Sequence, residues 1–274
     1  MHVKLGCALF AIALTAVTAA PSTHAKDRSI ILQSTTSTAN SGLYKFILPK
    51  FKAKTGITVR VVAVGTGQAL RNGRAGDGDV LLVHAKSAEE KFVAAGYGVR
   101  RFDVMYNDFV IVGPAKDPAN VRSTKSASAA FAKIAKTKAL FASRGDNSGT
   151  HKKERQLWTV ANIDPSPSSG KWYRETGSGM GVTLNIAVGM GAYTMTDRGT
   201  WISFKNKQNF EVLLEGDKAL FNQYGIILIS PERHKNVNAR DGQAFIDWIL
   251  SGEGQSAIAS YKLGGKQLFF PNAK

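Results

Sequence analysis

Cysteine is almost absent from the sequence, and the single residue, Cys7, lies in an apolar segment close to the N-terminus. The rest of the chain therefore has no thiol for a disulfide, a thiolate metal site or a nucleophile. Acidic residues are also few: 20 Asp and Glu stand against 36 Lys and Arg in 274 residues, a formal net charge of +16. This excess of positive charge predicts an anionic partner, for which nucleic acid is the usual first candidate.

Long hydrophobic runs are missing after the first 25 residues. Lys4 precedes an apolar run over 5–20, and small residues lead up to Ala25. Because a membrane-spanning helix needs roughly 20 apolar residues, this shorter run predicts a secretory signal over residues 1–25 that is cleaved after Ala25. We therefore expect a periplasmic protein without a stable membrane anchor, which retains nearly all of its positive charge.

Patterns for metal or nucleic acid binding are missing as well. Outside the signal segment, no histidine lies at ligand spacing with another histidine or a cysteine. The tryptophans have apolar neighbours, whereas a nucleic acid stacking platform would place them among Lys and Arg. We therefore expect no protein-ligated metal, no cofactor and no nucleic acid partner. These residues are His84, His151 and His234, and Trp158, Trp172, Trp201 and Trp248.

Short β-branched runs alternate with helical patterns from Lys26 onward, which is typical of an α/β protein with mostly parallel strands. A chain of this size is where single hydrophobic cores begin to divide, so two lobes are plausible. Strands are expected at 29–33, 58–64, 80–84, 109–112, 140–142, 193–195 and 225–229. Helices are expected at 41–55, 87–95, 123–138 and 241–250, the first of them kinked by Pro49.

Four expected strands run into turns rich in Ser, Thr or Gly that open a helix. The first N–H groups of a helix have no partner within it and attract anions, and glycine permits a close approach. Each turn alone is also explained as an ordinary helix cap. Their recurrence at strand ends, where α/β sheets bind ligands, favours an anion site. The turns lie at 34–38, 64–70, 143–151 and 177–181.

The third turn contains Arg144, whose planar guanidinium suits two oxygens of a tetrahedral oxyanion. Asp146 could hold that guanidinium in place, or the two could form only a surface ion pair of little energetic value. Ser148 and His151 invite an enzymatic interpretation as nucleophile and base. They are three residues apart near a helix start, without a strained nucleophile elbow, so we expect no enzyme and keep an exported phosphoesterase as the contrasting alternative.

Seven segments together resemble the tungstate-binding periplasmic proteins of ABC transporters, the TupA-like group. The resemblance runs in the expected order over nearly the whole chain after residue 25, although Ser34 stands where the family's usual Thr-Thr-Thr-Ser begins. The segments are 34–43, 64–70, 78–84, 105–114 (MYNDFVIVGP), 143–154 (SRGDNSGTHKKE), 179–184 and 193–201 (YTMTDRGTW).

This resemblance implies a type II periplasmic-binding-protein fold. Two α/β lobes, each a mostly parallel sheet flanked by helices, would close on a ligand in the cleft between them. Lobe 1 would comprise residues 26–113 and 224–274, and lobe 2 residues 114–223.

The resemblance also implies the residues of the site, because 144–150 is similar to the oxyanion loop of periplasmic phosphate-binding proteins. In that loop the Arg, Ser and Thr positions touch the anion and the Asp orients the Arg, which is the role implied for Asp146. Met180 and Gly181 of the fourth turn are further candidates. The implied oxyanion ligands are Thr35, Thr36, Ser37, Gly65, Thr66 and Gly67 from lobe 1, and Arg144, Ser148, Gly149 and Thr150 from lobe 2.

Tungstate is the implied ligand, delivered by a monomeric protein to an inner-membrane permease and its ATPase. Phosphate carries protons at neutral pH and needs an acceptor, whereas tungstate, molybdate and sulfate need only donors. The lobe 1 turns contain no Asp or Glu, so phosphate is disfavoured while molybdate and sulfate stay open. Nanomolar binding requires about 12 kcal/mol, or roughly seven charge-assisted hydrogen bonds after the cost of association, so both lobes should contribute.

Overall fold

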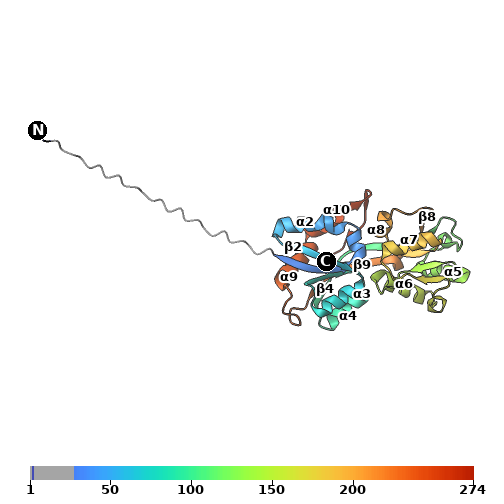
Figure 1. Cartoon of the computed structure of the whole chain (residues 1–274), viewed down its shortest axis with the longest axis horizontal. Coiled ribbons are helices and arrows are strands. Elements are labelled where there is room, and N and C mark those ends of the chain that lie inside the picture. Colours follow the sequence, from blue (N-terminus) through green and yellow to red (C-terminus); the bar gives the residue numbers. More distant parts are fainter. Residues whose placement is uncertain (1, 3–27) are drawn as a thin grey trace.

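The computed structural model describes residue 2 and residues 28–274. The expected signal segment, apart from residue 2, lies outside the described residues. Within the described part of the chain, no helix is both long enough and apolar enough to cross a membrane. Two groups of helices and strands lie side by side, and strands β4 and β9 run between them (Figure 1). We call these groups lobe 1 and lobe 2.

Lobe 1 is built on a mixed sheet with the strand order β12-β4-β9-β3-β1-β2. Strand β1 (Ser29–Thr35) pairs in parallel with β2 (Thr58–Val64) and β3 (Val80–Val83). Strand β9 (Phe221–Ile229) lies antiparallel between β3 and β4 (Gly98–Pro114). The other elements of this lobe are α1 (Thr36–Asn40), α2 (Leu43–Thr55), α3 (Thr66–Ala75), α4 (Lys86–Ala94), α9 (Ala239–Leu250), α10 (Gly252–Ser260), β10 (Lys262–Leu263), β11 (Lys266–Gln267) and β12 (Phe270–Pro271).

Lobe 2 continues from the same long strand, because the second half of β4 pairs with β7 (Thr194–Asp197) and β8 (Phe210–Leu214). Strand β5 (Phe141–Ser143) pairs in parallel with β6 (Tyr173–Glu175), and a bridge from Phe141 to Tyr193 joins β5 to the start of β7. The helices here are α5 (Ala127–Thr137), α6 (Gly149–Val160), α7 (Met180–Met190) and α8 (Arg198–Ser203), with short 3-10 turns η1 (Val121–Ser123), η2 (Ser166–Ser168) and η3 (Lys218–Leu220).

Strand β4 changes partners within a single step. Asp108 is paired with Phe221 of β9, and the next residue, Phe109, is paired with Asp197 of β7. Strands β4 and β9 are therefore the two segments through which the chain crosses from one lobe to the other.

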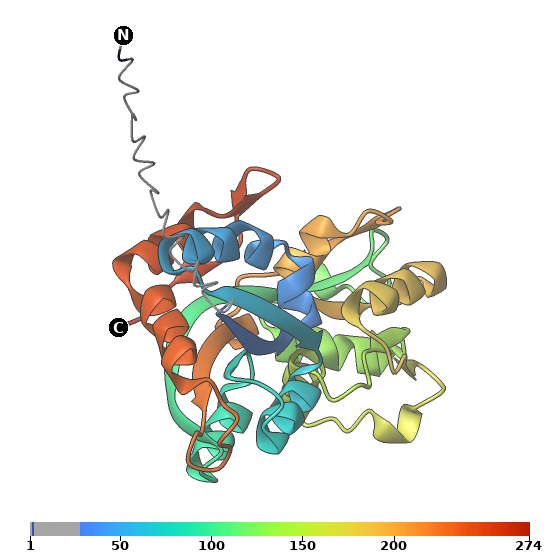
Figure 2. The same ribbon diagram turned by 60° about the vertical axis from the view of Figure 1, so that its left-hand side comes forward.

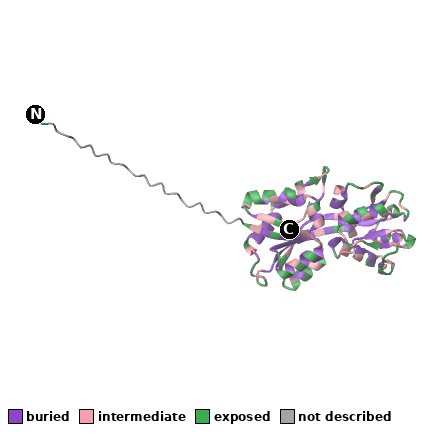
Figure 3. Ribbon diagram, in the orientation of Figure 1, coloured by how far each residue is buried: buried purple, intermediate pink, exposed green. Residues whose placement is uncertain are grey.

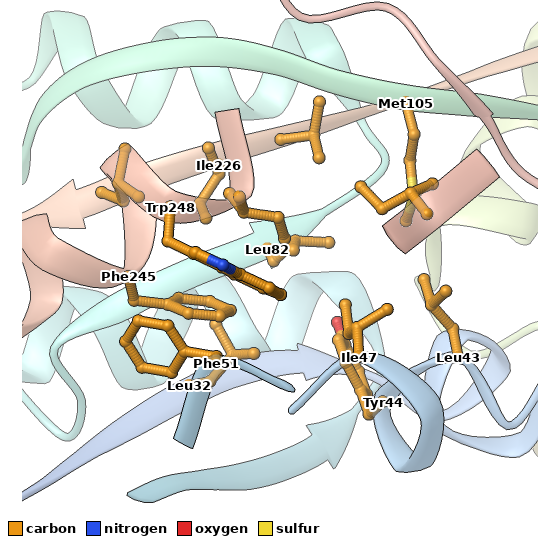
Figure 4. Close-up of a cluster of buried hydrophobic side chains, with 14 of the residues drawn as sticks. Leu32, Leu43, Tyr44, Ile47, Phe51, Leu82, Met105, Ile226, Phe245 and Trp248 are labelled. Atoms are coloured by element: carbon orange, nitrogen blue, oxygen red, sulfur yellow. The ribbon is translucent and has the colours of Figure 1, made fainter. Parts of the chain in front are cut away.

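Each lobe has its own hydrophobic core. In lobe 1, Phe51 of α2 packs against Phe245 and Trp248 of α9, with ring centroids 5.1 and 5.3 Å away (Figure 4). The N-terminal strands and the C-terminal helices thus lie side by side although they are far apart in sequence (Figure 2). In lobe 2, Phe131 and Trp158 meet edge to face at 4.3 Å. In both lobes the strands are mostly buried and the outer faces of the helices are exposed (Figure 3).

The α/β, two-lobe fold expected from the sequence is confirmed, but the expectation of mostly parallel strands is wrong. Strand β9 returns from lobe 2 and enters the lobe 1 sheet against the direction of its neighbours, and β7 and β8 also run antiparallel to β4. The strand expected at 109–112 is part of the 17-residue β4. Helix α2 continues through Pro49.

Candidate functional site

Three helices begin beside one another at the junction of the lobes. Helix α1 follows β1 directly with Thr35 as its N-cap, and α3 follows β2 with Gly65 as its N-cap. Helix α6 begins after β5 and a five-residue loop, with Ser148 as its N-cap. A helix start presents N–H groups without helical partners and a partial positive charge, so this arrangement suits an anion.

The starts of α3 and α6 touch across the junction. A Cβ atom on Gly67 would lie 2.9 Å from the amide nitrogen of the Asn147 side chain, and one on Gly149 would lie 3.0 Å from Oγ1 of Thr66. Gly65 faces the backbone of Ser148. Glycine at these positions lets the two lobes approach until their backbones are in contact, so the structure holds the lobes closed.

The predicted ligand residues are almost entirely enclosed by this closure. Among the residues of the described chain, Oγ1 of Thr66, Nε of Arg144 and Oγ1 of Thr150 are buried side-chain atoms with no hydrogen-bond partner. Buried polar groups in proteins are normally satisfied, so such atoms gathered from two lobes indicate a place where a polar ligand belongs. Thr35, Ser37 and Ser148 are buried beside them, while Thr36 and Gly65 are half-buried.

Arg144 and Asp146 form a buried pair rather than a surface one. Arg144 is only 4% exposed, and its Nη2 donates to Oδ2 of Asp146. The other oxygen, Oδ1, accepts from the backbone N–H of Ser148 at 3.1 Å. Asp146 therefore braces the guanidinium and the start of α6 together, and it leaves Nε of Arg144 without a protein partner.

The fourth predicted turn is placed differently. The side chain of Met180 packs into the lobe 2 core with Leu184 and Ala187, so only its backbone at the start of α7 is available to a ligand. No atom lies within 4 Å of the position of a Cβ on Gly181. Their part in binding stays a prediction.

Two buried polar residues at the junction were missed by the sequence analysis. His84, at the end of β3, is 5% exposed, and its Nε2 lies 3.3 Å from Oγ of Ser37. Asp197 caps α8 through hydrogen bonds from the N–H and Oγ1 of Thr200. Burial raises the pKa of Asp197, and the nearby Arg144 acts in the opposite direction. Both residues end strands that the sequence indicates, but only the folded chain brings them to Ser37 and Arg144.

The geometry required of a hydrolase is not formed. Oγ of Ser148 accepts from the backbone N–H of His151, and Nδ1 of His151 accepts from the backbone N–H of Asn147. In the part of the chain that is described, no hydrogen bond joins the Ser148 hydroxyl to the His151 ring, and no group of three His, Cys, Asp or Glu could hold a metal ion.

A cavity of about 760 Å³ adjoins the closed junction and shares His84 and Gly149 with it. Burial lowers the pKa of Lys152 in its wall, and the nearby Arg71 and Arg74 act in the same direction. Such a wall of one sign attracts anions toward the junction. Its charged residues are Lys86, Glu90, Lys91, Lys152 and Lys153.

Comparison with known proteins places this geometry in a family. A family model described as a PBP superfamily domain matches residues 20–253. The tungstate-binding protein TupA of Peptoclostridium acidaminophilum is 49% identical over 97% of this chain and 95% of its own, and TupA of Campylobacter jejuni is 40% identical over 87% and 89%. The solved structure of a tungstate-binding TupA from Desulfovibrio alaskensis superposes with a TM-score of 0.77 at 48% identity, covering 90% of this chain and 100% of that one.

These matches span nearly the whole chain and agree with the two-lobe fold and the enclosed junction. The chain therefore belongs to the PBP superfamily and, within it, to the family of TupA tungstate-binding proteins.

Proposed function

We propose that this protein is the substrate-binding component of an ABC importer and that it captures tungstate between its two lobes. The observation that carries the proposal is the set of buried, unpartnered donors that converge from both lobes, Thr66, Arg144 and Thr150. They lie where the starts of α3 and α6 meet, so side-chain donors and helix N–H groups point to one small volume.

The chemistry of these groups suits a fully deprotonated tetrahedral dianion. Arginine offers two adjacent donors to two oxygens, and each threonine hydroxyl offers one. Charge-assisted hydrogen bonds contribute about 1.5–3 kcal/mol each, so tight binding needs donors from both lobes. A closed form with the anion enclosed would then differ in shape from the open form, which gives a membrane permease a basis for recognising the loaded protein.

The remaining features of this proposal follow the same model. The protein acts in the periplasm as a monomer and hands tungstate to a permease driven by an ATPase. Lobe 1 comprises residues 26–113 and 224–274 and lobe 2 residues 114–223, a division supported by the change of partners in β4 and by the return of the chain through β9. Thr35, Thr36, Ser37, Gly65, Gly67, Ser148 and Gly149 complete the ligand set, with Asp146 as the residue that orients Arg144.

Calorimetric titration of the protein lacking residues 1–25 with tungstate, molybdate, sulfate and phosphate tests the proposal. We expect 1:1 binding of tungstate with nanomolar affinity and at least tenfold weaker binding of molybdate. Equal affinity for tungstate and molybdate would make the protein a general receptor for these two similar oxyanions. Absence of binding to all four anions would refute the proposal.

A further inference from the structure

His84 connects the proposed anion site to the strands that join the lobes. Its Nε2 lies 3.3 Å from Oγ of Ser37 in α1, and its Nδ1 lies 3.1 Å from Oδ1 of Asn222 in β9. Gly149 of lobe 2 lies against the ring, since a Cβ there would be 2.8 Å from Cε1 of His84. The imidazole is thus held between both lobes and one connecting strand.

The chain of hydrogen bonds continues to the second connecting strand. Nδ2 of Asn222 donates to Oδ1 of Asn107 in β4 at 2.6 Å and lies 3.4 Å from the hydroxyl of Tyr224. All three residues are buried. In this arrangement Nδ2 of Asn107 is a buried donor that finds no partner among the described residues, which is an unfavourable end to the chain.

The imidazole is neutral and has one N–H. Burial and the nearby Arg144 lower the pKa of His84 to about 4. With Oδ1 of Asn222 facing Nδ1, that nitrogen carries the proton and Nε2 accepts from the hydroxyl of Ser37. The Ser37 hydroxyl then has no proton left for an anion and presents only lone pairs.

Turning both asparagine amides by half a rotation reverses every donor in the chain. Nδ2 of Asn107 then donates to Asn222, Asn222 donates to Nδ1 of His84, and Nε2–H of His84 donates to Oγ of Ser37. The unpartnered Asn107 donor gains an acceptor, and the proton of Ser37 is released. Oγ1 of Thr35, 3.2 Å from Oγ of Ser37, already accepts from the N–H of Thr38, so an anion is the better acceptor for that proton.

We propose that His84 is a specificity-determining residue that, by donating from Nε2 to Ser37, turns the Ser37 hydroxyl toward the anion as a donor. A site set in this way favours oxyanions without protons. In the opposite direction Ser37 would accept a hydrogen bond, which suits a protonated oxyanion such as monohydrogen phosphate. This inference rests on the proposed function, because it requires an oxyanion beside Ser37.

Nitrogen-15 NMR of histidine-labelled, tungstate-loaded protein reads the proton position directly. The His84 signals are assigned by their loss in His84→Gln. We expect the neutral tautomer protonated on Nε2. A neutral ring protonated on Nδ1, or a doubly protonated ring, in the loaded protein would overturn the inference.

A pair of amide variants tests the consequence for specificity. The amide nitrogen of His84→Gln reaches the position of Nε2, whereas that of His84→Asn reaches only the position of Nδ1. We expect His84→Gln to keep tungstate affinity within about threefold and His84→Asn to lose about tenfold, the value of one hydrogen bond, while its preference for tungstate over phosphate narrows. Ser37→Ala should remove the difference between the two variants.

Equal losses in His84→Gln and His84→Asn, with unchanged preference between the anions, would show that the imidazole serves packing alone and would overturn the inference. His234→Gln is the control, since His234 lies beside Gly76 of lobe 1 and outside the site. Failure of the wild-type protein to bind tungstate would refute the proposed function itself. Tungstate binding with the other tautomer would refute only the role of His84.

Discussion

Arg144 is a nearly buried cation whose nearest negative charge satisfies only part of it. Asp146 takes one nitrogen of the guanidinium, and Nε is left without a partner among the described residues. Burying a charge is unfavourable unless it is fully paired and hydrogen-bonded. The arginine is therefore placed for binding and contributes little to folding stability.

Replacing Arg144 by Ala should lower tungstate affinity at least a hundredfold, because about two charge-assisted hydrogen bonds are lost. The midpoint of thermal unfolding without ligand should change little. Calorimetric titration and a thermal melt measure the two effects. Arg122→Ala is a matched control, since Arg122 also forms an ion pair in lobe 2 but is exposed. Undiminished affinity in Arg144→Ala would place the site elsewhere.

Local sequence could indicate Arg144 and Asp146 because the two residues are neighbours in one turn whose composition suits an oxyanion. His84 carries no such signal: it follows an apolar strand and precedes an ordinary helix. Its importance comes from Ser37, 47 residues earlier, and from Asn222, 138 residues later. Asp197 was missed for the same reason, since its relation to Arg144 exists only in the folded chain.

At the scale of secondary structure, the contact between the starts of α3 and α6 makes glycine necessary. Gly149→Ala would place a Cβ 2.8 Å from His84 and 3.0 Å from Oγ1 of Thr66, both in lobe 1. Contacts this short must be relieved by separating the lobes. We expect tungstate affinity to fall by about tenfold or more, with an unfolding midpoint close to that of the wild type in the absence of ligand.

Small-angle X-ray scattering with and without tungstate provides the structural measurement for Gly149→Ala. The variant should stay more expanded than the wild type at saturating ligand. Gly189→Ala in α7 is the control, because nothing lies within 4 Å of its added Cβ. A Gly149→Ala protein that binds and compacts like the wild type would contradict the tight contact.

Helix α6 also carries a buried carboxyl group that should make lobe 2 sensitive to pH. Burial raises the pKa of Glu154 to about 7 from its ordinary 4.5, against the effect of hydrogen bonds from Ser143, Tyr173 and Trp158. Between these values the folded protein keeps a proton that the unfolded chain releases. The contribution of Glu154 to stability is therefore present below about pH 4.5 and is lost as the pH rises to about 7.

Glu154→Gln should remove this loss, since the amide can accept from Trp158 and Tyr173 and donate to Ser143. We expect its free energy of unfolding at pH 8 to exceed that of the wild type by on the order of 2 kcal/mol, with a flatter profile between pH 4.5 and 7. Denaturant unfolding at several pH values measures this, with the exposed Glu232→Gln as control. Parallel profiles for Glu154→Gln and wild type would show that Glu154 is charged throughout.

Most helices and strands could be predicted from their periodicity, but strand direction could not. The run at 58–64 became β2 without change, because its alternating β-branched residues pair along their whole length with β1. Strand β4 was predicted only where it is continuously apolar, at 109–112; residues 98–108 mix charged and apolar residues and become a strand through pairing with β9. That partner comes more than 100 residues later, so no local pattern could indicate it.

At the scale of the whole molecule, the positive charge should act on the rate of capture. The chain carries 36 basic against 20 acidic residues, and four lysines line the cavity beside the junction. Attraction between this surface and a dianion speeds encounter and is screened over about 10 Å at 0.1 M salt. The association rate constant for tungstate should therefore fall several-fold as salt rises from roughly 0.01 to 0.1 M.

Stopped-flow fluorescence of the tryptophans measures this rate. The double variant Lys152→Gln, Lys153→Gln should associate more slowly and show a weaker salt dependence, with its dissociation rate little changed. Lys133→Gln on α5, away from the cavity, is the control. An association rate that is independent of salt in the wild-type protein would show that steering plays no part.

The position of β9 in the sheet also sets an order of events during synthesis. Strand β9 separates β3 from β4, so the lobe 1 sheet is divided into two pieces until residues 221–229 have been made. The strands of lobe 2, from the second half of β4 through β8 at Leu214, are complete before that point. Lobe 2 can therefore finish folding while the chain is still being delivered from its C-terminal side, whereas the lobe that carries the first-made residues must wait for the last third of α9 and α10 to cover it.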